Sequence, residues 1–312
     1  MGKVVKIEKH KASSPTIVTI GTFDGVHVGH QKIINRLITI GKHDKLQSVI
    51  LTFFPHPRMV LQKDADIKLI NTIEERHKIL DKLGLDYLLI QEFTKAFSRV
   101  SAEAFVQEVL VNKLNVKKVI IGYDHRFGRN RNADITDLIK FGKAFDFEVE
   151  EISKQDIDDV AVSSTKIRKA LLNGDIQKAN RYLGYPFMLT GTVVKGRGIG
   201  KQLAYPTANI KIAENYKLIP KQGAYVVKST ISNTVVFGMM NIGMNPTVNG
   251  NCESIEVHFF DFDTSIYGKH IQIDVLERIR DEQKFESVEA LKAQLEKDKI
   301  FSLNFINTYN AK

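Results

Sequence analysis

Hydrophobic positions between residues 16 and 184 follow two alternating patterns. Short apolar, β-branched runs predict buried strands at residues 16–20, 48–53, 87–91, 118–122 and 148–152. Between them, apolar residues spaced three and four apart predict amphipathic helices at 30–41, 72–83 and 101–114. Thr72 and Glu75 form a capping-box pattern at the start of the second helix, and Ser101 suits the N-cap of the third. This alternation predicts an α/β domain, with helices on both faces of a parallel sheet.

After residue 184 the pattern changes. Strand-like runs at 189–195, 224–231, 235–242, 254–262 and 271–279 follow one another without helices, and turn residues such as Asn249 and Gly250 separate them. Regular short strands with turn signals predict a barrel or a sandwich. A final helix is predicted from about Ser287. We therefore predict two domains, residues 1–184 and 185–312, and the length of 312 residues also favours two domains.

Charge and cysteine content narrow the class of protein. The formal net charge is +9, but the basic residues are dispersed, so a solvated basic surface explains them better than a nucleic-acid-binding tail. The lone Cys252 forms neither an intramolecular disulfide nor a cysteine-based metal site. We find no secretory signal pattern and no apolar run of the roughly 20 residues that span a bilayer. We therefore expect a cytoplasmic protein with neither a membrane nor a nucleic acid as partner.

The first predicted strand leads into a segment rich in glycine and histidine. His27 and His30 stand three residues apart at a predicted helix start, where exposed backbone N–H groups favour anions. Gly21 and Gly25 let the backbone approach a ligand closely. A zinc pair is less well supported, because no His-Glu-x-x-His pattern and no cysteine partner accompany these histidines. The segment predicts a phosphate-binding site with the residues Gly21, Phe23, Gly25, His27 and His30.

A second candidate element opens another predicted helix. Ser164, Thr165 and Arg168 place two hydroxyls and a guanidinium in its first turns, a suitable phosphate clamp. The simpler interpretation is an ordinary N-cap with an exposed arginine. Together with the histidine segment in one α/β domain, this element favours a nucleotide site.

These motifs resemble the HxGH nucleotidylyltransferases, and among them the adenylyltransferase half of the bacterial bifunctional riboflavin kinase/FAD synthetase family. The resemblance extends to residues 52–58 and 122–128. It implies that the phosphate of FMN attacks the α-phosphorus of ATP and that pyrophosphate leaves, with Mg²⁺ bridging the phosphates. It also implies that the triphosphate is held by His27, His30, Ser164, Thr165 and Arg168, and the flavin by Phe54, His56 and Asp124.

The second half carries its own candidate groups. Gly196 and Gly200 belong to a glycine-rich loop that matches neither a Walker A nor a Rossmann pattern, and a flexible hairpin is the simpler interpretation. Thr207 and Asn209 share one face if they lie in a strand, which suits a magnesium–phosphate site. Glu256 points away from its apolar neighbours, either as a solvent-facing acid or as a general base.

With residues 241–247 and 267–268, these groups resemble the riboflavin kinase module of the same family. The resemblance implies a small antiparallel β-barrel in which Gly196, Gly200, Thr207 and Asn209 serve ATP, Thr207 and Asn209 also bind Mg²⁺, and Glu256 is the base at the ribityl 5′-hydroxyl of the flavin. The implied partners are ATP, riboflavin, FMN and FAD. Weak self-association into a homo-oligomer is left as an open alternative. Departures from the family pattern occur at Phe54, His125, Asn132 and Ala204.

We therefore predict a bifunctional enzyme whose barrel phosphorylates riboflavin to FMN and whose first domain adenylylates FMN to FAD. Two alternatives stay open. One is an HxGH transferase with another acceptor and a barrel that only binds a ligand. The other is a flavin- or RNA-binding regulator without turnover.

Overall fold

A computed structural model describes residues 2–62, 67–123, 125–153, 162–196, 200, 203–247 and 250–311. The predicted flavin contact Asp124 lies outside these residues. The chain divides into two compact units, Met1–Ser164 and Thr165–Lys312.

The first unit is built on a six-stranded parallel sheet in the order β1-β4-β3-β2-β5-β6. From the central β2 the chain continues to β3 and β4 on one side and later to β5 and β6 on the other, so the strand order reverses between β2 and β5. Ligands in such sheets bind beyond the carboxyl ends of the strands at this reversal. The bounds are β1 (Lys3–Lys6), β2 (Thr16–Ile20), β3 (Gln47–Phe54), β4 (Tyr87–Glu92), β5 (Val116–Gly122) and β6 (Glu148–Ile152). The predicted parallel sheet is confirmed, and β1 is an additional strand.

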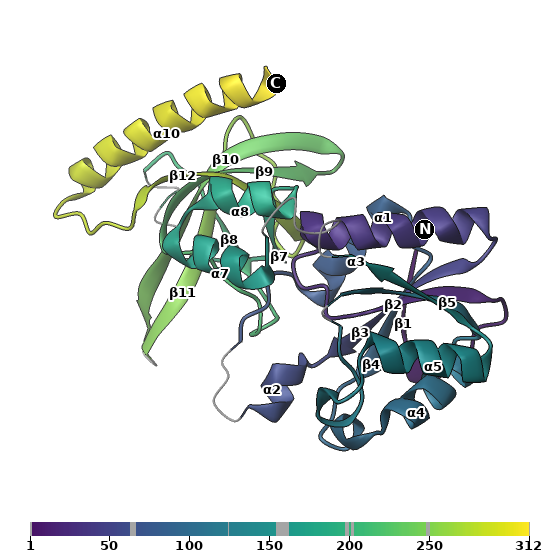
Figure 1. Ribbon diagram of the computed structural model, residues 1–312. Helices are drawn as coiled ribbons and strands as arrows, with labels where there is room; N and C mark the ends of the chain where they lie inside the picture. The colour runs from purple at the N-terminus through teal and green to yellow at the C-terminus, as the bar shows by residue number, and fades with distance from the viewer. Residues whose placement is uncertain are drawn as a thin grey trace. The chain divides into compact units, whose positions relative to one another are not determined.

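Helices cover both faces of this sheet, as predicted (Figure 1). The helices α1 (Val28–His43) and α3 (Ile73–Leu83) lie over one face, and α4 (Ala102–Phe105) and α5 (Ile135–Phe145) over the other. The helix predicted at 101–114 is α4 followed by a π-helical stretch, Val106–Lys113. The predicted capping box of α3 is present, because Thr72 N–H donates to Glu75 Oε2 at 2.9 Å and Glu75 N–H donates to Thr72 Oγ1 at 3.1 Å. Shorter elements are α2 (Pro57–Leu61) and the 3₁₀ turns Ile7–Lys9, Phe97–Arg99 and Arg129–Arg131.

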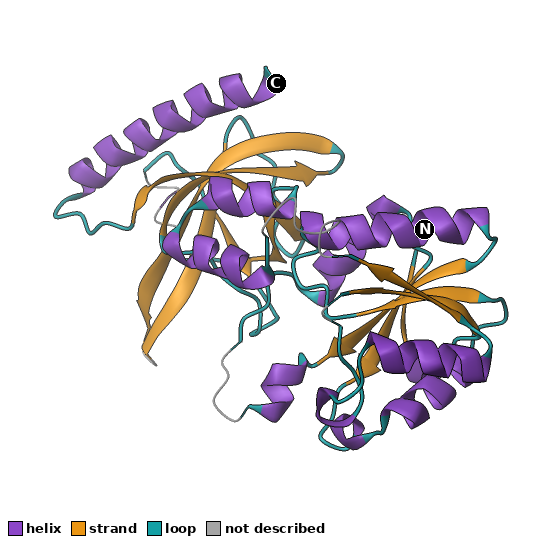
Figure 2. Ribbon diagram, in the orientation of Figure 1, coloured by secondary structure: helices purple, strands orange, loops and turns teal. Residues whose placement is uncertain are grey.

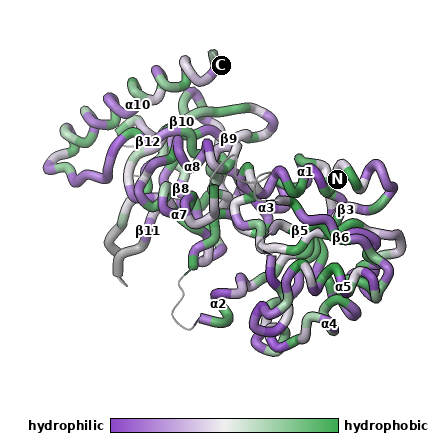
Figure 3. The backbone as a smooth tube through the Cα atoms, viewed as in Figure 1, coloured by the Kyte–Doolittle hydropathy of each residue, from purple (hydrophilic) through white to green (hydrophobic). Residues whose placement is uncertain are grey.

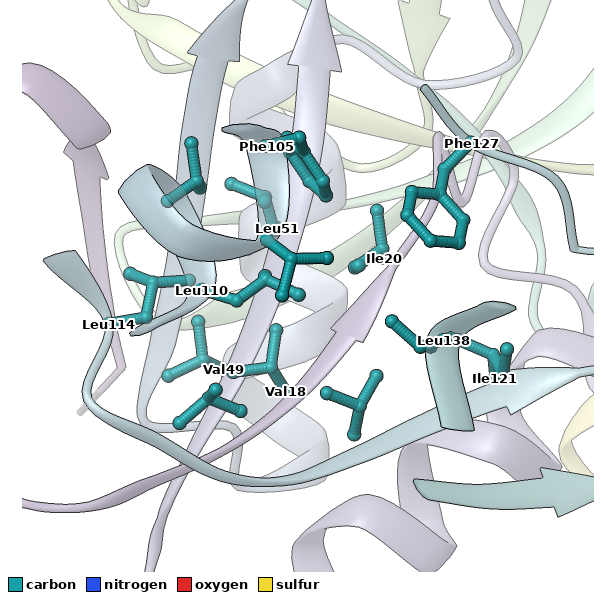
Figure 4. Packing of buried hydrophobic residues seen from close by; sticks show 14 of the residues in the cluster. Val18, Ile20, Val49, Leu51, Phe105, Leu110, Leu114, Ile121, Phe127 and Leu138 are labelled. Atoms are coloured by element: carbon teal, nitrogen blue, oxygen red, sulfur yellow. The ribbon is translucent and has the colours of Figure 1, made fainter. Parts of the chain in front are cut away.

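The core of the first unit lies between the sheet and the helices α4 and α5. Val18, Val49 and Leu51 of the central strands are fully buried against Leu110 and Leu138 (Figure 4). Strands covered on both faces bury both sets of side chains, which explains why the sequence shows continuous apolar runs rather than strict alternation.

The second unit contains a closed six-stranded barrel in the order β10-β11-β8-β7-β12-β9, with antiparallel neighbours (Figure 2). The predicted antiparallel barrel and C-terminal helix are confirmed. Its elements are α7 (Ser164–Asn173), α8 (Ile176–Leu183), β7 (Phe187–Val194), β8 (Ala208–Lys211), β9 (Gly223–Ile231), β10 (Thr234–Thr247), β11 (Gly250–Phe259), β12 (His270–Asp281) and α10 (Val288–Asn310).

Strand β11 alternates between the inside and the outside of the barrel. Ile255, Val257 and Phe259 are buried, whereas Glu256 and His258 are only half-buried. Successive strand residues point to opposite faces, so Glu256 projects from the outer face. Apolar side chains of this strand therefore pack in the barrel interior, and its polar candidate group lies on the outer face.

The C-terminal helix α10 is attached to the barrel by a buried ion pair. Asp298 is 2% exposed, and Arg280 of β12 donates to both of its carboxylate oxygens, with Nε at 3.1 and 3.0 Å and Nη2 at 2.8 Å from Oδ2. Gln294 adds a further hydrogen bond to the same carboxylate at 2.8 Å. Hydropathy alternates along α10 (Figure 3), and Ile300 and Phe301 stay exposed. Among the described residues, no helix has the length and apolar character that crossing a membrane requires.

Replacing Asp298 by Ala should destabilise the second unit, because it leaves the Arg280 guanidinium buried without its counter-charge. Breaking a buried pair costs about 3–5 kcal/mol, and we expect about 2–3 kcal/mol here because the Arg280 side chain is 15% exposed. For a unit of this size, that corresponds to a fall in Tm of roughly 5 to 10 °C. Thermal unfolding measures it, with Lys297→Ala, an exposed change on the same helix, as the control. Equal melting of the two variants would contradict the role of the pair.

Candidate functional site

The two predicted histidines meet at the start of α1, beyond the carboxyl end of β2. His27 is the N-cap of α1, and its Nδ1 accepts the backbone N–H of His30 at 3.3 Å. The two rings stack with their centroids 3.6 Å apart and their planes 19° apart, and Phe23 packs edge-on against His30 at 5.1 Å. The prediction that both histidines share one face at a helix start is confirmed. An anion at this position would meet two imidazoles and the amino end of a helix.

The turn before the histidines is strained. Val26 N–H donates to the carbonyl of Phe23 at 3.1 Å, and the φ angles are +44° at Phe23, +86° at Gly25 and +34° at Val26. Gly25 tolerates a positive φ, but Phe23 and the β-branched Val26 do so at a cost of about 1–3 kcal/mol each. Such strain persists only where the surroundings hold the backbone firmly, and it is concentrated at functional sites.

Burial sets the charge of the histidine pair. It lowers the pKa of His27 from 6.5 to about 4, against a smaller opposing effect of Asp24. Burial also lowers the pKa of His30 well below 6.5, and the charges of His27 and Arg76 lower it further. Both rings are therefore neutral at pH 7 in the absence of ligand, and each carries one N–H donor.

The first unit should consequently lose stability in mild acid. The unfolded chain takes up a proton at His27 below pH 6.5, whereas the folded protein does so only near pH 4, so the free energy of unfolding falls as the pH drops between these values. His27 alone accounts for about 2 kcal/mol between pH 7 and pH 5. We expect thermal unfolding of the wild type to be more sensitive to this pH change than that of His27→Asn. Equal sensitivity would contradict the low pKa.

The second predicted phosphate element opens a helix as expected. Ser164 begins α7, and its hydroxyl donates to the backbone carbonyl of Asp24 at 2.8 Å, directly beside the histidine turn. Thr165 is exposed and Arg168 half-buried on the same helix. The structure therefore brings Ser164 to the histidine motif, and phosphate contacts of Thr165 and Arg168 stay predictions.

Two of the predicted flavin contacts lie at the carboxyl end of β3. Phe54 ends β3 and His56 is the N-cap of α2, so both have the expected extended backbone. His125 follows β5 and stacks on Phe127 with the ring centroids 6.0 Å apart. A chain of aromatic rings, not predicted from the sequence, packs beneath these loops and consists of Phe53, Phe93, Phe97, Phe105 and Phe127.

The predicted groups of the second unit meet on the outer face of the barrel. Thr207 Oγ1 donates to Glu256 Oε2 at 3.1 Å, and Asn209 of β8 is the direct cross-strand neighbour of Glu256 of β11. Directly opposed residues have Cβ atoms about 5 Å apart on the same face of the sheet. The sequence pattern therefore correctly placed Thr207 and Asn209 on one face, and the barrel adds the carboxylate.

Both glycines of the candidate loop lie against this group. A side chain at Gly196 would collide with the amide of Asn209, and one at Gly200 would collide with the Tyr205 carbonyl and lie 3.3 Å from Thr207 Oγ1. Only glycine fits such a close approach. Ala204, which replaces a common glycine of the family, has a φ of +62°, which explains why glycine suits this position.

Two polar residues extend the group on the far side of Glu256. Asn241 of β10 is its cross-strand neighbour there, and the Asn241 side chain hydrogen-bonds Glu282. Partial burial raises the pKa of Glu282, while the Asn241 hydrogen bond and the charge of Arg280 lower it and the Glu256 carboxylate raises it by a smaller amount. Glu282 was not predicted from the sequence, because a single acid among other charged residues has no distinctive spacing or motif.

Two surface hollows lined by described residues lie away from these groups. One of about 210 Å³ is lined by Lys3, Gln47 and Tyr87, and one of about 330 Å³ by Arg36, His43 and Lys118. Both lie at the amino ends of the parallel strands, opposite the histidine motif. Because their lining residues include none of the predicted site residues, we rest the candidate sites on the chemistry of the groups themselves.

A reversing parallel sheet with paired histidines beyond its central strand, followed by a barrel with a Thr–Asn–Glu group, defines a two-domain transferase of the nucleotidyltransferase–kinase class. The FAD synthetase family model matches residues 9–166, and the riboflavin kinase family model matches residues 183–306. The chain belongs to the bifunctional riboflavin kinase/FMN adenylyltransferase family.

Curated relatives agree along nearly the whole chain. The bifunctional riboflavin kinase/FMN adenylyltransferase of Listeria monocytogenes is 40% identical over 90% of this chain and 90% of its own length. That of Escherichia coli K12 is 33% identical over 93% of this chain and 92% of its own. A crystal structure of a Streptococcus pneumoniae protein described as a macrolide-efflux protein matches with a TM-score of 0.85 and 31% identity, over 97% of this chain and 99% of that one.

The predicted family, fold class and enzyme class are therefore confirmed. The chain carries a FAD synthetase domain followed by a riboflavin kinase domain, and both activities of the family are transferase activities. Flavins fit these activities as substrates and products, and ATP as the donor.

Proposed function

We propose that the first unit transfers the adenylyl group of ATP to FMN, with His27 and His30 at the phosphates. The stacked histidine pair at the amino end of α1, beyond the strand reversal, carries this proposal. A phosphate oxygen of FMN attacks the α-phosphorus of ATP, the bond to the β-phosphate breaks, and pyrophosphate leaves. The imidazole N–H groups and the backbone N–H groups of the helix stabilise charge on the reacting phosphates. Ser164, Thr165 and Arg168 hold the triphosphate in this assignment.

In the second unit, the hydrogen bond between Thr207 and Glu256 carries the corresponding proposal for riboflavin phosphorylation. The ribityl 5′-hydroxyl oxygen attacks the γ-phosphorus of ATP, the β–γ bridge breaks, and ADP leaves. Glu256 takes the hydroxyl proton, because an alcohol hardly ionises at neutral pH. Gly196 and Gly200 let the loop backbone approach Asn209 and Thr207 closely, and in this assignment the same loop contacts the ATP phosphates.

Mg²⁺ is the proposed metal partner of ATP. The hydroxyl of Thr207 and the amide oxygen of Asn209 are hard oxygen donors on one face of the barrel, beside a carboxylate, and so they fit this cation. No cluster of three or more His, Cys, Asp or Glu is present in the described part of the chain. A sparse protein ligand set is usual for Mg²⁺ that is held mainly by nucleotide phosphates. Bound Mg²⁺ supplies neutralisation of the phosphate charge.

The flavin of the first unit is assigned to the loops after β3 and β5. Phe54 and His56 are half-buried there, and Asp124 stays a prediction. We place the domain boundary at residue 184/185, close to the start of the riboflavin kinase match at residue 183, although the compact units divide at 164/165. A cytoplasmic location, the absence of nucleic-acid binding and the oligomeric state also stay predictions. The efflux name belongs to the S. pneumoniae protein and is not transferred to this chain.

The test is to incubate the purified protein with riboflavin, ATP and Mg²⁺ and to separate the flavins by chromatography. We expect FMN to appear first and FAD to follow. FMN without FAD would contradict the assignment of the first unit. Unchanged riboflavin, with supplied FMN also left unconverted, would overturn the flavin function and favour another acceptor for the HxGH site.

A further inference from the structure

A buried ion pair lies behind the histidine motif. Asp24 and Arg76 are each 1% exposed, and Arg76 Nη2 lies 3.6 Å from Asp24 Oδ1. Burying two charges is expensive, and apolar residues of similar volume often replace such a pair without loss of stability. Stability is therefore a weak explanation for this pair, and its surroundings indicate a different one.

Asp24 holds the strained turn from both sides. Its carboxylate accepts the backbone N–H groups of Ile70, at 3.0 and 3.1 Å, and of Asn71, at 3.2 Å. Its backbone carbonyl accepts the Ser164 hydroxyl. Asp24 stands between Phe23 and Val26, the two non-glycine residues of this turn that have positive φ. These bonds supply the constraint that keeps such a turn in place.

Arg76 connects this turn to the sheet. Its Nη1 donates to Thr52 Oγ1 at 3.2 Å, and that hydroxyl donates to the carbonyl of Thr22 at 3.3 Å. Arg76 therefore reaches Thr22 through Thr52, on one side of Phe23, and reaches Asp24 directly, on the other. Its positive charge also contributes to the low pKa of His30. Among the described residues of the first unit, the charged groups that influence the pKa of the two rings are Asp24 and Arg76, together with the rings themselves.

We propose that Arg76 is a positioning residue for adenylyl transfer, which holds the turn at residues 22–26 through Asp24 and Thr52 so that His27 and His30 face the phosphates. This inference rests on the proposed function of the first unit. The same guanidinium opposes protonation of His30 before nucleotide binds. If Arg76 only packed in the core, removing its charge would leave the titration of the histidines unchanged.

The experiment compares Arg76→Gln, which removes the charge, with Arg76→Lys, which keeps it, in the full-length protein. Arg36→Gln, on the exposed Arg36–Glu150 pair, is the control. Steady-state rates of FAD formation from FMN and of riboflavin phosphorylation are measured in each preparation. The titrations of His27 and His30 are followed by NMR and assigned through His27→Asn and His30→Asn.

For Arg76→Gln we expect kcat of FAD formation to fall at least about tenfold while KM for FMN changes little, because displaced catalytic groups cost rate more than binding. His30 should titrate at higher pH, because a nearby positive charge has been removed. Arg76→Lys should keep the wild-type titration and recover part of kcat. Riboflavin phosphorylation should stay within about twofold in all variants, because the barrel packs separately.

Unchanged histidine titration in Arg76→Gln, or a loss of FAD formation no larger than in Arg36→Gln, overturns the inference. If Arg76→Gln lowers both activities together or fails to fold, Arg76→Lys decides. In Arg76→Lys, histidine titrations that match the wild type together with a reduced rate of FAD formation then support the inference. Histidine titrations that differ from the wild type overturn it. A wild-type protein that does not convert FMN to FAD refutes instead the proposed function of the first unit.

Discussion

Replacing Glu256 by Ala is expected to lower kcat of riboflavin phosphorylation by about 10²- to 10⁴-fold, the usual contribution of a positioned general base. The carboxylate lies on the outer face of the barrel, within 3.1 Å of the Thr207 hydroxyl and opposite Asn209, where a substrate hydroxyl and ATP phosphates would meet. FAD formation from supplied FMN should stay within about twofold, because that reaction belongs to the other unit. Chromatographic rate measurements with each substrate separate the two effects.

A matched control is available on the same strand. Glu253 of β11 is also an acid, is exposed, and is not part of the proposed site, so Glu253→Ala should keep both activities. If Glu256→Ala phosphorylated riboflavin at the wild-type rate, the base would have to be another group, and Glu282 would be the first to test.

Replacing His30 by Ala should produce the opposite pattern. The ring stacks on His27 at the amino end of α1, and its Nδ1 is buried without a hydrogen-bond partner among the described residues, as a group reserved for a ligand would be. Losing one preorganised donor at a charge-developing site costs about 10²- to 10³-fold in kcat. We therefore expect FAD formation from FMN to fall by that factor while riboflavin phosphorylation is retained.

His43→Ala is the control for this variant. His43 lies in the last turn of the same helix with its side chain 87% exposed, so its loss should change neither reaction. If His30→Ala retained full FAD formation, the histidine motif would not be the phosphate site of the first unit.

The sequence was sufficient to predict most of the fold. Short apolar runs, alternating with segments of helical periodicity, predicted the parallel sheet and its helices. The two patterns differ because each strand is buried on both faces and each helix on one. The C-terminal barrel followed from successive strand-like runs with turn residues between them. Strand β1 was not predicted, because Lys3–Lys6 is mostly exposed and has no apolar run. The short β8 was also not predicted, since its four residues extend a polar motif.

The candidate sites were predictable where several groups share one short segment. His27 and His30 on one helix start, and Thr207 and Asn209 two residues apart, have spacings that local geometry fixes. Residues that come together only in the folded structure have no fixed spacing in the sequence. Arg76 lies 52 residues beyond Asp24 in the sequence, and the signal available was a charged residue on the buried face of α3, beside Ile79 and Leu80. Such a residue in a core-facing position deserves a search for a buried partner.

The alternation along β11 also matters for adaptation and engineering. One strand supplies the packing residues Ile255 and Val257 and the chemical group Glu256 on opposite sides of a closed wall. Interior substitutions that conserve volume change stability with little effect on the outer surface. Substrate preference and heat resistance of the barrel could therefore be altered independently, by directing mutations to alternate positions of the same strand.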